Sequence, residues 1–216
     1  MANGLGKNQS TAMMSCSKTV IGVLALQGDF DAHRRRLEEL GAAVVLVRKP
    51  EQFDDIDGLV IPGGESTTFL KLLGEQGFEK LRQFVQAKPT FGTCAGAILL
   101  AKEVSNPAQN GLGAIDVGVR RNAYGRQINS SIREGKLAEG PIEMVFIRAP
   151  KFDRVGPRVE VLAWDGADPV LVRQGNVLAA TFHPELSADT RVHQVFLRLV
   201  QRQLPTSSGK KATSNK

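Results

Sequence analysis

The strongest constraint on the fold is a series of short, almost wholly apolar runs that alternate with helical patterns through the first half of the chain. The first run, at 20–26, is rich in β-branched residues, and the segments 43–47 and 58–61 have the same character. Strands that are apolar on both sides fit a parallel sheet whose two faces are covered. A helical pattern at 30–40, ended by Gly41, separates the first two runs and predicts a right-handed βαβ unit.

The same alternation continues toward the middle of the chain. Helical segments are expected at 67–73 and 78–86, followed by a short strand at 90–91 and a further helix at 97–103. This order of strands and helices predicts an α/β domain built around a parallel sheet.

The second half of the chain changes to strand-like segments separated by Gly, Pro and Asp, which favour an antiparallel extension of the sheet. A last helix at 189–203 carries apolar residues on one face and should pack against the sheet. Together these patterns predict a flavodoxin-like three-layer α/β sandwich with a mostly parallel sheet. The strand-like segments of the second half are 114–120, 142–148, 158–163, 170–173 and 177–182.

The positive charge of the chain is concentrated at its two ends, so it does not indicate a nucleic-acid-binding surface. The formal net charge is +6, and five lysines outside the patterned region account for most of it. We expect a single domain at 19–204, flanked by a disordered leader at 1–18 and a disordered basic tail at 205–216, and no nucleic-acid partner. The five lysines are Lys7, Lys18, Lys210, Lys211 and Lys216.

The sequence predicts neither a membrane span nor a secreted protein. No apolar run approaches the roughly 20 residues that span a bilayer, and 1–18 lacks the apolar segment of a secretory signal. We therefore expect a cytoplasmic location and no membrane partner. In a reducing compartment Cys16 and Cys94 make a weak case for a disulfide, so the internal Cys94 prompts a search for a nucleophile.

Cys94 has the local context of a nucleophile on a strand-to-helix turn. It lies in Gly92-Thr93-Cys94-Ala95-Gly96, after an apolar strand and before a helix. Small residues two positions to either side permit the tight backbone of such an elbow, and the nearby helix N-terminus favours the thiolate. The alternative is a buried structural cysteine, and the flanking glycines favour the nucleophile.

Of the three histidines, His183 is the one placed to act as a base. It begins a His-Pro-Glu sequence at the end of a predicted strand. Residues two apart in an extended chain point the same way, so Glu185 can accept a hydrogen bond from one ring nitrogen while the other nitrogen faces Cys94. His33 lies on the apolar side of the first helix and is expected in the core or an interface. His193 is expected at the surface.

A glycine-rich turn with the sequence Pro-Gly-Gly-Glu-Ser follows another apolar strand, at 62–66. A backbone N–H group of this turn, at Gly64, and the N–H of Ala95 could together hold a developing oxyanion. The three chemical loops all follow predicted strands. Since the carboxyl ends of parallel strands meet at one edge of a sheet, we expect the loops to converge there.

These residues together resemble the class I, or triad, glutamine amidotransferase family. The pattern of that family combines a Gly-x-Cys-x-Gly elbow, a glycine-rich oxyanion strand and a late His-x-Glu, matched here at 92–96, 63–64 and 183–185. The resemblance implies a class I glutamine amidotransferase-like fold. It also implies a Cys-His-Glu triad that hydrolyses L-glutamine to L-glutamate and ammonia without a metal or cofactor.

Within that family the chain most resembles the glutaminase subunits of pyridoxal 5′-phosphate synthase, over about 20–200. The resemblance implies a glutamine site that includes two arginines, and the chemistry agrees. Arg121 and Arg148 can meet the α-carboxylate of glutamine, and Glu65 can meet its α-ammonium. For each arginine the alternative is a solvated surface charge. The full set implied is Gly63, Gly64, Glu65, Arg121, Ile147 and Arg148, and the matching stretches are 22–28, 62–68, 91–96, 121–127 and 146–150.

A partner chain is expected because 216 residues hold no second catalytic domain that could use the ammonia. The resemblance implies that this partner is the synthase subunit, a (β/α)8 barrel. The expected docking surface is the helix bearing Asp31, His33 and the arginines at 34–36, with Gln27 and Gly28 before it.

Three alternatives stay open at the level of sequence. The chain could be the amidotransferase subunit of another pathway, or a stand-alone cysteine hydrolase of related fold. It could also be a non-catalytic binding domain, although an intact Cys94, His183 and Glu185 speak against that.

Overall fold

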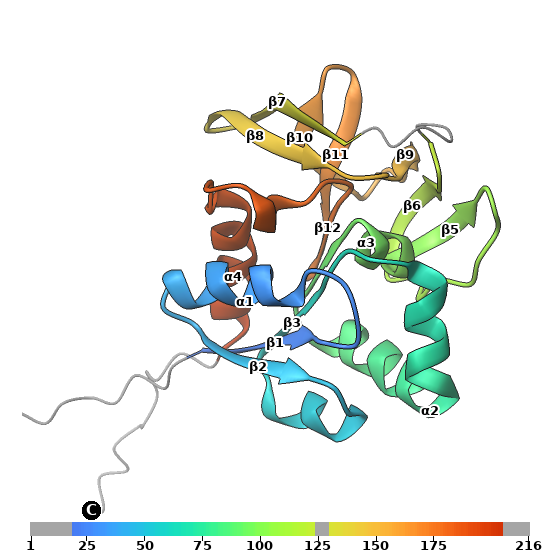
Figure 1. Cartoon of the computed structure of the whole chain (residues 1–216), viewed down its shortest axis with the longest axis vertical. Coiled ribbons are helices and arrows are strands. Elements are labelled where there is room, and N and C mark those ends of the chain that lie inside the picture. Colours follow the sequence, from blue (N-terminus) through green and yellow to red (C-terminus); the bar gives the residue numbers. More distant parts are fainter. Residues whose placement is uncertain (1–18, 124–129, 205–216) are drawn as a thin grey trace, which may run out of the picture.

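The computed structural model describes residues 19–123 and 130–204, which form an α/β structure around a central sheet (Figure 1). The leader predicted at 1–18 and the tail predicted at 205–216 lie outside these residues. Most of the motif at 121–127 lies outside them as well.

Within the described residues, nine strands form the main sheet in the order β2-β1-β3-β4-β12-β11-β10-β7-β8. Neighbours from β2 to β12 run parallel, and those from β12 to β8 run antiparallel. The predicted parallel sheet with an antiparallel extension is therefore confirmed. The parallel strands are β1 (Val20–Leu24), β2 (Ala43–Val47), β3 (Gly58–Ile61), β4 (Thr90–Thr93) and β12 (Val177–Ala180), and the antiparallel strands are β7 (Ser131–Leu137), β8 (Gly140–Phe146), β10 (Glu160–Asp165) and β11 (Asp168–Gln174).

Helices cover both faces of the parallel part of the sheet, as Figure 1 shows. Successive residues of β3 point to opposite faces, so Val60 joins the core beneath α1 and α4 while Leu59 and Ile61 join the core beneath α2 and α3. Both cores are apolar and closely packed, which confirms the predicted three-layer sandwich. The helices are α1 (Phe30–Glu39), α2 (Ser66–Ala87), α3 (Ala95–Leu100) and α4 (Arg191–Gln203).

A second, three-stranded sheet is the main departure from the predicted fold. Its strands β5 (Ala101–Ser105), β6 (Ile115–Arg120) and β9 (Lys151–Val155) lie in the order β5-β6-β9. The helix predicted at 97–103 therefore ends at Leu100, and the segment predicted at 114–120 does not belong to the main-sheet extension. Pairing between β5 and β6 overrides the helix propensity of the residues that follow α3.

The two helices predicted at 67–73 and 78–86 both lie within α2 and are separated by a kink at Gly74, whose φ of 62° is not helical. Two short 3₁₀ helices, η1 (Pro50–Asp55) and η2 (Pro184–Leu186), occupy loops of the described chain. None of the helices in residues 19–123 and 130–204 combines the length and the apolar character that crossing a bilayer requires.

The parallel strands bring their carboxyl ends to one edge of the sheet. In the register, Ile61 of β3 lies beside Gly92 of β4, and Thr93 of β4 lies beside Ala180 of β12. The chain leaves these strands as three adjacent loops. At this edge α3 packs so closely on β3 that a Cβ on Gly96 would lie 2.0 Å from the carbonyl oxygen of Ile61.

This close contact makes Gly96→Ala a sharp test of the architecture. The added methyl group must push α3 away from β3, so we expect the free energy of unfolding to fall by about 1–3 kcal/mol or more. Gly77→Ala, within α2, is the matched control, because a Cβ at Gly77 would meet its nearest neighbours at an ordinary 3.5 Å. Alanine there should stabilise the protein by roughly 0.5–1 kcal/mol. Urea denaturation measures both, and equal values would contradict the packing described.

Candidate active site

Cys94 lies at the junction between β4 and α3 with a backbone conformation that is unusual for a residue other than glycine. Its φ is 47° and its ψ is −101°. Its N–H donates to the carbonyl oxygen of Ala180 at 2.9 Å, which ties the turn to β12. The side chain is 6% exposed and the sulfur forms no disulfide within the described residues. Strain of this kind persists where surrounding structure holds it, and it is typical of nucleophile elbows.

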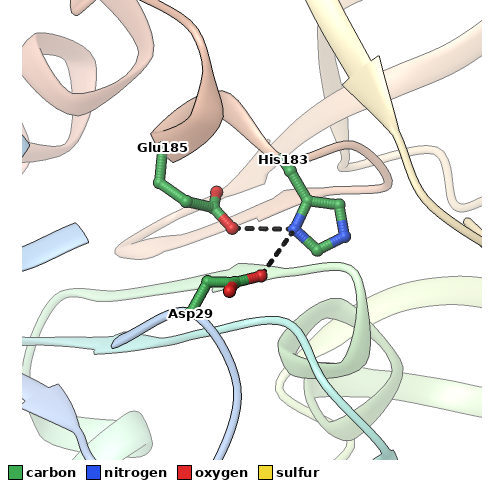
Figure 2. Close-up of side chains that lie close together, drawn as sticks. All are labelled: Asp29, His183 and Glu185. Carbon is green, nitrogen blue, oxygen red and sulfur yellow. Dashed lines mark hydrogen bonds and ion pairs between the residues drawn. The ribbon is translucent and has the colours of Figure 1, made fainter. Parts of the chain in front are cut away.

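His183 and Glu185 lie after β12, and Figure 2 shows their side chains facing each other. The Nδ1 atom of His183 lies 2.7 Å from Oε1 of Glu185, and both side chains are buried. The backbone N–H of His183 donates to the carbonyl oxygen of Val145 at 2.8 Å. On the other side of the ring, a Cβ on Gly63 would lie 2.4 Å from Cε1 of His183, so only glycine fits there. The ring is therefore held in one orientation.

The charge of His183 depends on both of its neighbours in the triad. Burial lowers the pKa of His183, but interactions with Cys94 and Glu185 outweigh burial and raise it to about 10. Within the described residues Nε2 of His183 makes no hydrogen bond of good geometry, and it faces the sulfur of Cys94. At neutral pH the ring is protonated, and its positive charge stabilises negative charge on the adjacent sulfur.

A second carboxylate, which sequence reasoning missed, approaches the same ring nitrogen. Oδ2 of Asp29 lies 3.9 Å from Nδ1 of His183, and its side chain is half exposed (Figure 2). Asp29 also raises the pKa of Glu185, although burial is the larger cause of that rise and the hydrogen bond from His183 opposes it. The three side chains could hold a metal by distance, but the hydrogen bond to Glu185 already occupies Nδ1.

A pocket with a volume of about 180 Å³ opens beside Cys94 and His183. It brings together most of the residues that the sequence predicted for binding, namely Gly64, Glu65, Arg121, Ile147 and Arg148. Gly63 and Ala95 do not line it, since Gly63 packs against the imidazole and Ala95 is fully buried. Lining residues that were not predicted are Asp29, Ser66, Ile98, Asn122 and Pro150.

Glu65 has a structural role at the mouth of the pocket that its sequence did not reveal. Its carboxylate caps α2 by accepting from the backbone N–H of Thr67 at 3.2 Å and of Thr68 at 2.8 Å. Arg121 donates to the same carboxylate at 3.2 Å. Burial raises the pKa of Glu65, but the hydrogen bonds from the two threonines bring it down to about 2. Glu65 is therefore negatively charged at neutral pH.

The two predicted arginines differ in their surroundings. The Arg121 side chain is 12% exposed and is paired with Glu65. Arg148 is exposed and has a φ of 45°. Within residues 19–123 and 130–204 it has no ion-pair partner, so its guanidinium is available to an anion entering the pocket.

The other two histidines are both buried. His33, expected in the core or an interface, is fully buried. His193, expected at the surface, is also fully buried, so that prediction was wrong. Its spacing could have shown this, because Leu197 and Val200 follow it by four and seven residues on the buried face of α4.

Comparisons with known proteins show which family the chain resembles. A model of the SNO glutamine amidotransferase family matches residues 23–202. The chain is 70% identical over 183 residues to the pyridoxal 5′-phosphate synthase subunit PdxT of Koribacter versatilis, covering 84% of this chain and 95% of the relative. The PdxT subunit of Thermosipho africanus is 53% identical over 186 residues, covering 84% and 99%. A crystal structure of a glutamine amidotransferase matches with a TM-score of 0.79 at 49% identity, covering 84% and 98%.

The Glu185–His183 contact predicts the effect of Glu185→Gln. Glutamine keeps the shape of the side chain but removes the charge, so the pKa of His183 should fall from about 10 toward its ordinary value of 6.5. Imidazole NMR signals followed against pH measure this. The control is Asp29→Asn, which removes a more exposed and more distant charge and should cause a smaller fall.

The raised pKa of His183 also makes the free energy of unfolding depend on pH. Because the folded pKa of His183 is raised, its protonated form stabilises the fold fully below about pH 6.5, and this contribution is lost as pH rises through about 10.

For the Glu185→Gln prediction, an unchanged His183 titration in the variant would show that Glu185 does not hold the charge of the ring.

Proposed function

The chain belongs to the SNO glutamine amidotransferase family, and we propose that it hydrolyses L-glutamine as the glutaminase subunit of pyridoxal 5′-phosphate synthase. The observation that carries the proposal is the convergence of Cys94, His183 and Glu185 beside a pocket lined by two arginines. The name shared by the relatives from Koribacter versatilis and Solibacter usitatus supports the synthase assignment.

In the first half of the proposed reaction, the Cys94 sulfur attacks the side-chain carboxamide carbon of glutamine. The carbonyl oxygen becomes an oxyanion, which backbone N–H groups at Gly64 and Ala95 stabilise. His183 then gives its Nε2 proton to the leaving nitrogen, so the C–N bond breaks and ammonia departs. A glutamyl thioester on Cys94 and a neutral imidazole remain.

In the second half, the neutral imidazole of His183 takes a proton from water, and the resulting hydroxide attacks the thioester carbon. The C–S bond breaks, glutamate leaves, and Cys94 and the protonated ring return to their starting state. Glu185 holds Nδ1 protonated throughout, so that Nε2 is the nitrogen that exchanges protons.

Charge in the pocket supports a free amino acid as the substrate. Arg148 and Arg121 offer guanidinium groups to the α-carboxylate, and Glu65 offers its negative charge to the α-ammonium. Since Glu65 also pairs with Arg121, the α-ammonium would approach a carboxylate that is already held in place.

The ammonia-using partner in this proposal is the synthase subunit, a (β/α)8 barrel, and both chains act in the cytoplasm. The proposed docking surface follows the exposed face of α1. His33 is buried and so does not belong to that surface. Arg34 and Arg35 form ion pairs with Asp31 on the helix, which leaves a surface with both charges for the partner to match.

Cys94→Ala should abolish glutamate release from glutamine and leave the thermal unfolding midpoint close to that of the wild type, because only a buried sulfur is lost. Glutamate release is measured with and without a pyridoxal 5′-phosphate synthase subunit, which should increase the wild-type rate. Full activity of the variant would refute the assigned nucleophile. Turnover of generic esters in preference to glutamine would favour the stand-alone hydrolase, and ammonia transfer to a different synthase would favour another pathway.

Arg148→Gln tests the proposed recognition of the α-carboxylate. Loss of a charge-assisted hydrogen bond of roughly 1.5–3 kcal/mol should raise KM for glutamine about 10- to 100-fold and change kcat less. Arg120→Gln is the control, because Arg120 pairs with Asp153 and does not line the pocket. Equal KM values for the two variants would place the α-carboxylate elsewhere.

A further inference from the structure

One buried imidazole outside the triad, that of His33, contacts both the turn that carries Cys94 and the Glu185 carboxylate. Nε2 of His33 lies 3.1 Å from Oγ1 of Thr93, the residue just before the nucleophile. The same nitrogen lies 3.2 Å from Oε2 of Glu185, the carboxylate oxygen that does not bind His183. His33 is fully buried in α1 and does not line the pocket. His33 therefore contacts the triad from the protein core, on the side away from the pocket.

The partners of His33 determine which of its ring nitrogens carries the proton. Within the described residues Oε2 of Glu185 accepts no hydrogen bond, and a nitrogen lone pair of His33 facing this oxygen at 3.2 Å would be repelled. These contacts favour a proton on Nε2 of His33, hydrogen-bonded to Oγ1 of Thr93 and close to the Glu185 carboxylate without forming a hydrogen bond to it. The remaining nitrogen, Nδ1, is then an acceptor.

His193 of α4 completes this arrangement. Its Nε2 lies 3.0 Å from Nδ1 of His33 and so acts as the donor. The other nitrogen of His193 is then unprotonated, which fits its having no hydrogen-bond partner in the described part of the chain. Every proton in the chain of contacts from α4 to the carboxylate is thereby assigned.

We propose that His33 is a positioning residue of the triad: its Nε2–H, held by Thr93, presents a positive dipole to the Glu185 carboxylate and so orients it, and His193 sets the tautomer that this requires. Without that dipole, Oε2 loses the polar group that faces it at 3.2 Å, and the carboxylate can rotate away from His183. The orientation of the His183 ring toward Cys94 then loses its support. The inference rests on the triad proposed above and adds residues that never touch the substrate.

Electrostatics keep the pair of histidines neutral, as this role requires. Burial, followed by the charges of His193 and His183, lowers the pKa of His33 well below its ordinary value. Burial and the nearby Arg36 lower the pKa of His193 to about 3. A neutral donor can orient the carboxylate without bringing a further full charge into the core.

The groups that face His33 come from four elements. They are Thr93 at the end of β4, Glu185 in η2, His183 after β12 and His193 in α4. The ring also meets the edge of Phe91, with centroids 6.1 Å apart. Since His183 and Glu185 form the buried charged pair of this set, the loss of His33 should be visible in the titration of His183.

Three variants at position 33 separate positioning from packing. His33→Gln places an amide nitrogen as many bonds from the backbone as Nε2, so it can still present an N–H group to Glu185. His33→Asn is equally polar but one bond shorter, and His33→Leu fills the space without a donor. We expect kcat close to wild type for the first variant and on the order of 100-fold lower for the other two, with KM for glutamine little changed.

Two further measurements need neither glutamine nor the synthase partner, so they are independent of the proposed function. In the Asn and Leu variants, the NMR midpoint of His183 should fall and alkylation of Cys94 by iodoacetamide at neutral pH should slow, and Gln should restore both. A merely structural role would lower the thermal midpoint without moving the His183 titration. Equal results for the Gln and Asn variants, or wild-type values for the Leu variant, would overturn the proposal.

His193→Gln provides the same test if position 33 tolerates no substitution. This variant acts on the site through the hydrogen bond of His193 to His33 and should reduce kcat and the alkylation rate partially. Wild-type values for both in a folded His193→Gln protein would overturn the role given to the pair. If glutamine is not hydrolysed by any form of the protein while the alkylation and NMR effects persist, the proposed function fails and the positioning role stands.

Discussion

The hydrogen bond between His183 and Glu185 is the interaction on which the candidate site depends. Both groups are buried, and a carboxylate without water is strongly destabilised unless a charge or donor faces it. The protonated ring meets that need, and its interactions with Cys94 and Glu185 together raise its pKa to about 10 despite burial. A positive charge held in this way lies beside Cys94 before any substrate arrives. Burial of Glu185 thus creates the electrostatic condition for the nucleophile.

The sheet supplies the alignment that this interaction needs. Cys94 and His183 are far apart in sequence, but they follow β4 and β12, which are adjacent and parallel. The bond from the N–H of Cys94 to Ala180 joins the two loops directly. Gly63, two residues after β3, packs against the imidazole of His183. Because each group is one to three residues from a strand, the geometry is set by rigid backbone and needs few additional contacts.

Sequence patterns were sufficient for the parallel sheet, and they also predicted the turn at Cys94 and the contact of His183 with Glu185, because each of these features has a local signal. Apolar β-branched runs marked the parallel strands, and small residues marked the turn around Cys94. They failed where distant pairing decides the outcome. The residues after Leu100 have helical propensity yet pair with β6, and neither the contact of Asp29 with His183 nor that of His33 with Glu185 has a local signature. Asp29 directly precedes α1 and His33 lies within it. This part of the chain lies beside the site only because the sheet brings α1 there.

The charges around the proposed pocket distinguish an amino-acid substrate from a simpler one. Glu65 is fixed by α2 and by Arg121, and its pKa of about 2 keeps it ionised at any physiological pH. Arg148 faces the same pocket without an ion-pair partner among the described residues. A neutral ester or peptide would leave these charges poorly matched, whereas a zwitterion offers an opposite charge to each of them. In a pocket of about 180 Å³, the same contacts would hold a short side-chain carboxamide toward Cys94. In the proposed reaction, the specificity of the site would therefore follow from charges held at a fixed distance from Cys94.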